Sequence, residues 1–145
     1  MLPHGECSED TAGGSPRRNT MIAGTGIDIV EISRFKHAKK KWGRDFLRKI
    51  FTENEIAYSR KRRFQDQHFA ARFAAKEAVL KAFGDKLSSI RNWQDIEVLN
   101  DKSGRPYIKF HKSARSLKSK EKIKGVVLSM AHCREHAIAN AILIR

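Results

Sequence analysis

The order of apolar and polar residues after residue 20 predicts an alternation of strands and helices. Residues 22–32 are mostly apolar, with Ile27 and Ile29 on one face of an extended chain and Asp28 and Val30 on the other. A strand that is apolar on both faces is typical of the centre of a sheet. We therefore expect a central strand here, with the Asp28 carboxylate buried or half-buried in it.

The strongest helical pattern spans residues 66–83. Phe69, Phe73 and Leu80 recur at helical spacing and form one stripe, while several alanines lie toward the other side. Small side chains there allow a neighbouring backbone to come close, so this helix is predicted to be buried around most of its circumference. Gly84 is expected to end it.

Shorter signals predict the remaining elements. Ser33 is expected to cap a basic helix, and the run Thr-Glu-Asn-Glu at 52–55 has the form of a capping box that opens another. The predicted elements are helices over 34–42, from 52 onward and over 112–124, and strands over 94–100, 106–110, 126–131 and 136–144.

Length and composition favour one domain of an intracellular protein. A chain of 145 residues is usually a single domain. Residues 1–20 lack periodicity and are predicted to be a disordered extension or an expression remnant, followed by one domain over 21–145. Two cysteines, no secretory signal and no apolar run of membrane-spanning length predict a cytoplasmic protein without a membrane segment.

The charge of the chain points to anionic partners. Lys and Arg number 30 against 16 Asp and Glu, for a formal net charge of +14. Such a surface attracts nucleic acid, anionic membranes, phosphorylated cofactors or acidic proteins. The basic runs 39–41 and 60–63 lack the interleaved aromatic residues of a base-stacking surface, and no nucleic-acid-binding motif is present.

Two carboxylates stand inside otherwise apolar elements, Asp28 in the first strand and Glu77 in the long helix. Such a group is costly to bury unless a cation, a metal or hydrogen bonds compensate it. Alone, Asp28 could cap a neighbouring element, and Glu77 could pair with Lys81 or Arg72 on its own helix. Together they suggest a magnesium site, because magnesium is commonly held by one or two carboxylates plus substrate phosphates.

Several other polar residues have both a structural and a functional interpretation. Lys76 interrupts the apolar stripe and could either extend its ammonium to the edge or contact a phosphate. Ser129 and His132, near the end of a predicted strand, could be structural or could contact a ligand. Cys133 would point away from His132 on a strand, which argues against a nucleophilic Cys–His pair.

Taken in order, these motifs resemble those of the holo-[acyl-carrier-protein] synthases, the small 4'-phosphopantetheinyl transferases. The matching runs are Gly-Ile-Asp-Ile-Val-Glu-Ile at 26–32, Phe-Thr-Glu-Asn-Glu at 51–55, Arg-Phe-Ala-Ala-Lys-Glu-Ala at 72–78, Lys-Ala-Phe-Gly at 81–84, Asp-Ile-Glu at 95–97, Gly-Arg-Pro-Tyr at 104–107 and Leu-Ser-Met-Ala-His at 128–132. The resemblance implies an α+β fold with a long buried helix packed on a small antiparallel sheet, assembled as a homotrimer with active sites between subunits.

The resemblance also implies a reaction. The 4'-phosphopantetheine group of coenzyme A moves to a serine of apo-acyl carrier protein, which gives holo-acyl carrier protein and adenosine 3',5'-bisphosphate in fatty acid biosynthesis. By this match Asp28 and Glu77 hold Mg²⁺, and Asp28, Glu77 and Lys81 are catalytic.

The implied binding residues follow from the same match. The coenzyme A contacts are Arg72, Lys76, Lys81, Ser129 and His132. The contacts with an acidic carrier protein are Arg34 and Arg44, and neither nucleic acid nor membrane is an expected partner. Two other interpretations stay open at this point: a basic nucleic-acid-binding module, and a degenerate family member that assembles with carrier protein without turnover.

Overall fold

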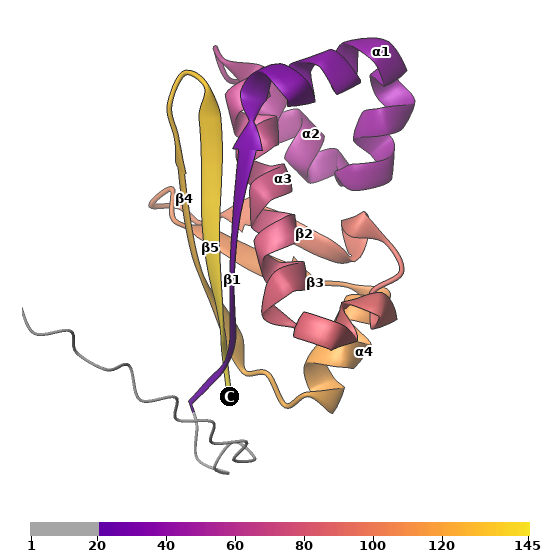
Figure 1. The fold of residues 1–145 in the computed structure, drawn as a ribbon, viewed down its shortest axis with the longest axis vertical. Helices are drawn as coiled ribbons and strands as arrows, with labels where there is room; N and C mark the ends of the chain where they lie inside the picture. The colour runs from indigo at the N-terminus through magenta and orange to yellow at the C-terminus, as the bar shows by residue number, and fades with distance from the viewer. Residues whose placement is uncertain (1–20) are drawn as a thin grey trace, which may run out of the picture.

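A long helix lies across one face of a three-stranded antiparallel sheet (Figure 1). The structure, a computed structural model, describes residues 21–145, and the predicted extension lies outside the described residues. The helix is α3 (Gln65–Ala82), and the sheet has the strand order β1-β5-β4. These strands are β1 (Ile22–Glu31), β4 (Gly125–His132) and β5 (His136–Ile144).

The other elements surround α3. They are α1 (Ile32–Ile50), α2 (Glu53–Arg60), the 3-10 turns η1 (Gly84–Ser89) and η2 (Trp93–Asp95), β2 (Ile96–Asn100), β3 (Pro106–Phe110) and α4 (Lys112–Lys120). Strands β2 and β3 form a separate antiparallel pair, in which β2 contacts α3 and β3 contacts β4 of the larger sheet (Figure 1). The α+β fold with a long buried helix is therefore confirmed.

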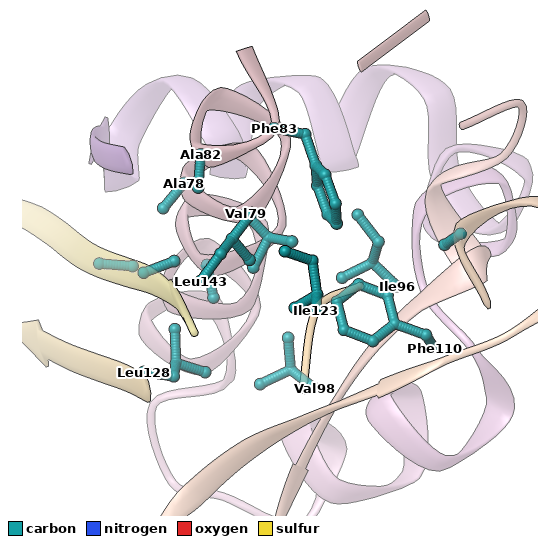
Figure 2. Packing of buried hydrophobic residues seen from close by; sticks show 14 of the residues in the cluster. Ala78, Val79, Ala82, Phe83, Ile96, Val98, Phe110, Ile123, Leu128 and Leu143 are labelled. Atoms are coloured by element: carbon teal, nitrogen blue, oxygen red, sulfur yellow. The ribbon is translucent and has the colours of Figure 1, made fainter. Parts of the chain in front are cut away.

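The main core fills the space on both sides of α3. In Figure 2, Val79 lies between Leu128 and Leu143 of the larger sheet and Ile96 and Val98 of β2. All five side chains are buried. This two-sided packing explains why α3 carries apolar residues around most of its circumference, as predicted.

Two glycines let α3 come into direct contact with β1. A Cβ atom on Gly26 would lie 1.9 Å from the carbonyl oxygen of Ala78, and one on Gly24 would lie 2.1 Å from that of Ala82. No side chain fits at such distances, so the close crossing depends on glycine in the strand and alanine in the helix. The crossing holds the next inward-facing residue of β1, Asp28, beside α3.

A second core of phenylalanines attaches α1 to α3. The ring of Phe35 lies within stacking or edge-to-face range of Phe46, Phe51 and Phe69, at centroid distances of 5.6, 6.1 and 6.2 Å. The backbone of α1 departs from helical geometry at Gly43, where φ is +61°. This break lets the second half of α1 turn back over the same core.

The position of β1 corrects the prediction of a central strand. β1 pairs only with β5 among the described residues and lies at the edge of the sheet. Ile27 and Ile29 face away from α3 and are 58% and 63% exposed. Apolar residues on both faces of a strand indicate that both faces can be covered, but they do not indicate the position of the strand in the sheet. In one protomer the second face of β1 is uncovered. Asp28 is half-buried, as expected.

Several element boundaries differ from the sequence prediction. Ser33 does not cap α1: the helix begins at Ile32, whose backbone N–H donates to the carbonyl oxygen of Glu135 in the β4–β5 turn, at 2.8 Å. The helix predicted over 34–42 is longer and spans Ile32–Ile50, whereas the helix predicted over 112–124 is shorter and spans Lys112–Lys120. The capping box at Thr52 and Glu55 is confirmed in both of its hydrogen bonds. Within residues 21–145, no helix is long and apolar enough to cross a bilayer.

Candidate active site

A cleft opens at the β1 edge of the sheet, between β1, α1 and α3. Its volume is about 510 Å³. Asp28 from β1, Glu77 and Lys81 from α3 and Arg34 from α1 line it, while Phe35 and Phe73 provide apolar wall. The close crossing of α3 over Gly26 produces this arrangement, because Glu77 and Lys81 directly precede the two alanines that touch the strand.

Lys81 and Asp28 form an ion pair that faces the cleft. The Nζ atom of Lys81 donates to Oδ1 of Asp28 at 2.8 Å and to the carbonyl oxygen of Ile27 at 3.2 Å. The hydrogen bond to Asp28 raises the pKa of Lys81. The lysine side chain is 52% exposed and the aspartate 15%, so the pair is accessible to a ligand.

Glu77 adds a second carboxylate to the same cleft. Partial burial raises its pKa, and the negative charge of Asp28 raises it further, whereas Lys81 acts in the opposite direction. Two carboxylates that repel each other in this way favour the presence of a cation. Lys81 supplies part of that positive charge in the structure.

The donor set of the cleft suits magnesium. Asp28 and Glu77 offer oxygen atoms only, and across residues 21–145 no group of three or more His, Cys, Asp or Glu side chains is placed to hold a metal. Magnesium is commonly bound by one or two carboxylates, with waters and substrate phosphates completing its octahedron. A zinc ion would require more protein ligands, including nitrogen or sulfur.

A second polar cluster lies at the opposite, β4 edge of the sheet. The ring of His132 is 5.4 Å from that of His68 on α3, which in turn is 6.0 Å from the ring of Tyr58 on α2. The guanidinium carbons of Arg62 and Arg72 lie 4.3 and 3.9 Å from the centroid of the Tyr58 ring. We call these five residues the cationic cluster.

The cationic cluster has the electrostatic character of an anion site. Burial lowers the pKa of His68, and the nearby charges of His132, Arg72 and Arg62 lower it further. Arg72 is only 2% exposed, donates to Oδ1 of Asn100 at 2.6 Å, and keeps an Nε atom without a hydrogen-bond partner. Positive groups gathered in this way would be stabilised by a bound phosphate.

The two parts of the site flank α3 within one protomer. Asp28 on β1 is paired with Ala139 of β5, and His132 on β4 is paired with Ala137 of the same strand. Both alanines are buried, so Asp28 and His132 lie on the helix-covered face of the sheet but at opposite edges. One protomer therefore brings Asp28, Glu77, Lys81 and Arg34 together and leaves Arg72 and His132 on the other side of α3.

Lys76 requires a correction. It is fully buried, and its Nζ atom lies 2.8 Å from Oε2 of Glu55 while donating to the carbonyl oxygens of Ile50 at 2.7 Å and Trp93 at 3.1 Å. An ammonium with all of its donors engaged inside the protein has none left for coenzyme A. Its position in the apolar stripe reflects a buried ion pair with α2, which helical spacing alone does not reveal.

Ser129 and Arg44 also lie apart from the predicted site. Ser129 is paired with Asn140 of β5, which lies between two alanines that face α3. Ser129 therefore points to the sheet face away from α3, whereas His132 is on the face that α3 covers. Arg44 follows the break in α1 and lines a separate small hollow with Arg48 and Arg60. Neither residue reaches the cleft of Asp28 within one protomer.

Sequence reasoning did not identify Tyr58, Arg62 and His68 as neighbours of Arg72 and His132. A signal was present for His68, because it precedes Arg72 by four residues and so shares a face of α3 with it. Arg62 belongs to the basic run 60–63, where nothing distinguishes it from its neighbours. Only its contact with the Tyr58 ring, which depends on the tertiary fold, distinguishes Arg62 from the other basic residues of this run.

Comparison with known proteins places this fold and site in a class. Residues 24–141 match the family model described as the 4'-phosphopantetheinyl transferase superfamily. Among solved structures, a holo-[acyl-carrier-protein] synthase from Neisseria meningitidis superposes with a TM-score of 0.78 at 30% identity, over 86% of this chain and 100% of that one. A holo-(acyl-carrier-protein) synthase from Bacillus anthracis in complex with CoA (3',5'-ADP) superposes with a TM-score of 0.69 at 34% identity, over 86% and 98%.

Curated relatives narrow the class to one family. Holo-[acyl-carrier-protein] synthase of Protochlamydia amoebophila is 41% identical over 122 residues, which cover 84% of this chain and 98% of the relative. The enzyme of the same name from Syntrophus aciditrophicus is 43% identical over 123 residues, 85% and 96% of the two chains. The chain thus belongs to the holo-[acyl-carrier-protein] synthase family of the 4'-phosphopantetheinyl transferases.

Proposed function

We propose that this protein transfers the 4'-phosphopantetheine group of coenzyme A to a serine of apo-acyl carrier protein, in a magnesium-dependent reaction of fatty acid biosynthesis. The observation that carries the proposal is the cleft in which Asp28, Glu77 and Lys81 converge beside an open cavity. These residues occupy the family motifs, and relatives from Bacillus anthracis and Helicobacter pylori are described as complexes with coenzyme A.

The cleft residues have separable roles in this reaction. Asp28 and Glu77 would hold Mg²⁺, which when bound neutralises charge on the pyrophosphate of coenzyme A. The half-exposed ammonium of Lys81 would contact a phosphate oxygen of coenzyme A in place of Asp28. Glu77, which lines the same cleft, would assist removal of the serine proton.

The bonds that change are those of the pyrophosphate. The serine oxygen of the carrier protein forms a bond to the phosphorus that carries pantetheine, and the bond from this phosphorus to the bridging oxygen breaks. Adenosine 3',5'-bisphosphate leaves with the bridging oxygen, and the serine proton passes to the base. The work of the protein is mainly to position the two substrates and to stabilise negative charge.

The cationic cluster is the proposed site for a phosphate of coenzyme A. Arg72 and His132 were expected to contact coenzyme A from the resemblance, and Arg62, His68 and Tyr58 surround them. Because this cluster and the cleft lie at opposite edges of one sheet, a complete site forms most simply where the β1 edge of one protomer meets the β4 edge of another. A contact between two different edges closes into a ring when the rotation between neighbours allows it, which suits the proposed homotrimer.

The uncovered sheet face supports such an assembly. Ile27, Ile29, Val127 and Ile138 are large apolar residues that remain exposed on the face away from α3. Contiguous apolar surface of this kind is typical of subunit interfaces.

Mixing Asp28→Asn with His132→Ala subunits by co-expression should restore part of the activity that each variant lacks alone, since some mixed sites would then contain both intact halves. Equal inactivity of the mixture would argue for sites within single protomers.

The second substrate is proposed to be an acidic carrier protein in the cytoplasm. Arg34 lines the cleft beside Asp28 and could meet a carboxylate of the partner close to the acceptor serine. Arg44 would lie farther along the same basic region. The exposed free thiol of Cys133 suits a reducing compartment.

The decisive experiment is intact-mass spectrometry of apo-acyl carrier protein after incubation with this protein, coenzyme A and Mg²⁺. A mass gain of one phosphopantetheine group that EDTA abolishes and Asp28→Asn lacks is the expected result. No gain with several carrier proteins, while the partner still binds, would identify a degenerate member of the family. No gain together with salt-sensitive binding of RNA would favour the nucleic-acid interpretation.

A further inference from the structure

An asparagine on β2 holds the buried arginine of the cationic cluster. Arg72 is 2% exposed, and its Nη2 atom donates to Oδ1 of Asn100 at 2.6 Å. Asn100 is the last residue of β2 and lies 28 positions further along the chain than Arg72, which is on α3. The contact therefore joins two elements that only the tertiary fold brings together.

The side-chain amide of Asn100 is itself held in one orientation. Its Nδ2 atom donates to the carbonyl oxygen of Gly104 at 2.9 Å, in the turn between β2 and β3. An amide has one donating end and one accepting end, whereas a carbonyl only accepts and a guanidinium only donates. The orientation with Nδ2 at Gly104 and Oδ1 at Arg72 is thus the one that satisfies both neighbours.

The ring of Tyr58 supports the same guanidinium from α2. The guanidinium carbon of Arg72 lies 3.9 Å from the centroid of this ring, within the range of a cation–π contact. A planar group that is bonded to Asn100 and packed on an aromatic ring has few orientations left. Its Nε atom has no hydrogen-bond partner among residues 21–145, so these contacts fix the guanidinium without using all of its donors.

The partner of Arg72 leaves its positive charge available. Lys76, one turn further along α3, is buried with the Glu55 carboxylate 2.8 Å away. In the described part of the chain no carboxylate forms such an ion pair with Arg72, whose recorded partner is a neutral amide. A buried cation is costly unless an anion compensates it. The arrangement is therefore suited to an anion that comes from outside the protein.

We propose that Asn100 is a positioning residue for coenzyme A, which holds the Arg72 guanidinium in the orientation that meets a phosphate of the substrate. The inference rests on the proposed transferase function and on the phosphate site assigned to the cationic cluster. Asn100 acts through Arg72 and does not itself touch the substrate. Fixing a side chain before the ligand arrives lowers the entropic cost of binding, so Asn100 affects the affinity for coenzyme A and not the transfer step.

Two other roles for Asn100 fit less well. A purely structural link from β2 to the helices is already present without it, because Val98 is buried in the core and its backbone N–H donates to Oε1 of Glu55 at 2.8 Å. Direct recognition of coenzyme A by Asn100 is disfavoured because both ends of its amide are engaged, one by Arg72 and the other by Gly104.

The first test measures coenzyme A binding by calorimetry, without carrier protein. In Asn100→Ala the Kd should rise by about 3- to 10-fold, as expected when one long side chain must be ordered on binding. Arg72→Met should raise it by about 10-fold or more. The double variant should bind no more weakly than Arg72→Met alone, because Asn100 acts only through Arg72. Losses that add in the double variant would overturn the inference.

A matched control removes another amide hydrogen bond to the same strand. Asn54 donates from Nδ2 to Oε1 of Glu97 on β2 at 3.0 Å, so Asn54→Ala weakens the attachment of β2 without touching Arg72. Its Kd for coenzyme A should equal that of the unchanged protein. An equal rise of Kd in Asn54→Ala and Asn100→Ala would show that any loosening of β2 has this effect, and the positioning role would be wrong.

The second test separates this inference from the proposed function. With apo-acyl carrier protein as the second substrate, Asn100→Ala should raise the KM for coenzyme A by the same factor as the Kd, with kcat within about twofold. Weakened coenzyme A binding in a protein that shows no transfer would support the positioning role and refute the transferase function. Transfer with an unchanged KM for coenzyme A in Asn100→Ala would refute the positioning role alone.

Discussion

Two lysine–carboxylate pairs on α3 have the same distance and opposite exposure. Lys76 Nζ lies 2.8 Å from Glu55 Oε2, and both side chains are fully buried. Lys81 Nζ lies 2.8 Å from Asp28 Oδ1, with the two side chains 52% and 15% exposed. The distance between partners therefore does not distinguish a structural pair from a functional one.

The difference lies in what else each pair can bind. Glu55 also accepts hydrogen bonds from the backbone N–H groups of Val98 and Thr52, both at 2.8 Å, so the buried pair joins α2, α3 and β2. Burial lowers the pKa of Lys76, and Glu55 opposes that change. The buried pair has no free position, whereas the Asp28–Lys81 pair faces a cavity and a second carboxylate. Only the latter can exchange partners with a substrate.

The largest expected effect comes from breaking the buried pair. Lys76→Met removes one partner and leaves the Glu55 carboxylate without its cation, which costs about 3–5 kcal/mol of folding free energy at buried sites. Urea denaturation at pH 7 measures the loss. The double variant Glu55→Gln/Lys76→Met should recover part of it. Unchanged stability with weakened coenzyme A binding would instead restore the interpretation of Lys76 as a phosphate contact.

The cleft carboxylates should show the reverse pattern. In Asp28→Asn, kcat/KM should fall on the order of 10²–10³-fold, the range seen when one preorganised electrostatic group is removed from a phosphoryl or acyl site. The urea midpoint should stay close to that of the unchanged protein, because the ion pair of Asp28 with the half-exposed Lys81 contributes only about 0–1 kcal/mol to folding. Asp101→Asn, in the β2–β3 turn, serves as the matched control. If Asp28→Asn kept more than half of the activity, Asp28 would not be a catalytic residue.

Replacing Lys81 should lower activity without lowering stability, with a smaller effect on activity than replacing Asp28. Its exposed ion pair contributes about 0–1 kcal/mol to folding, so Lys81→Met should unfold at nearly the same urea concentration. Loss of one charge-assisted contact to coenzyme A should lower kcat/KM by about 10-fold. The variant Lys86→Met, which breaks another exposed pair on η1, should leave kcat/KM unchanged. Equal activity of the two variants would show that Lys81 only anchors Asp28.

The long helix and the cleft were predictable because local patterns determine them. The spacing of Phe69, Phe73 and Leu80 reports a helix in contact with other elements, and Gly26 with the alanines of α3 reports a close crossing. The strand carboxylate just after that glycine and the helix carboxylate beside those alanines lie in one cleft once α3 crosses β1 at Gly26. Asp28 and Glu77 could therefore be assigned to one cleft from their neighbours.

The exceptions depend on partners that are distant in the sequence. Whether Lys76 is buried or extends to solvent depends on Glu55, which only the packing of α2 brings into reach. β1 lies at an edge because it has no second neighbouring strand within residues 21–145, and Ile27 would give the same sequence pattern in a central strand. Ser129 illustrates a parity effect, because a shift of one residue moves a strand side chain to the other face of the sheet.

The smallest expected effect concerns the cost of keeping Glu77 in the cleft. Its pKa is raised by burial and by Asp28, so folding favours the protonated form. The stability that follows is present below the pKa of the unfolded chain, about 4.3, and is lost as the pH rises through the higher folded pKa. In EDTA, Glu77→Gln should therefore raise Tm slightly at pH 7 and leave it nearly unchanged near pH 4, although its transferase activity is lost. Glu135→Gln, at an exposed turn, should raise Tm at neither pH. A lower Tm at pH 7 would mean that Glu77 stabilises the fold and that the cleft is not under electrostatic strain.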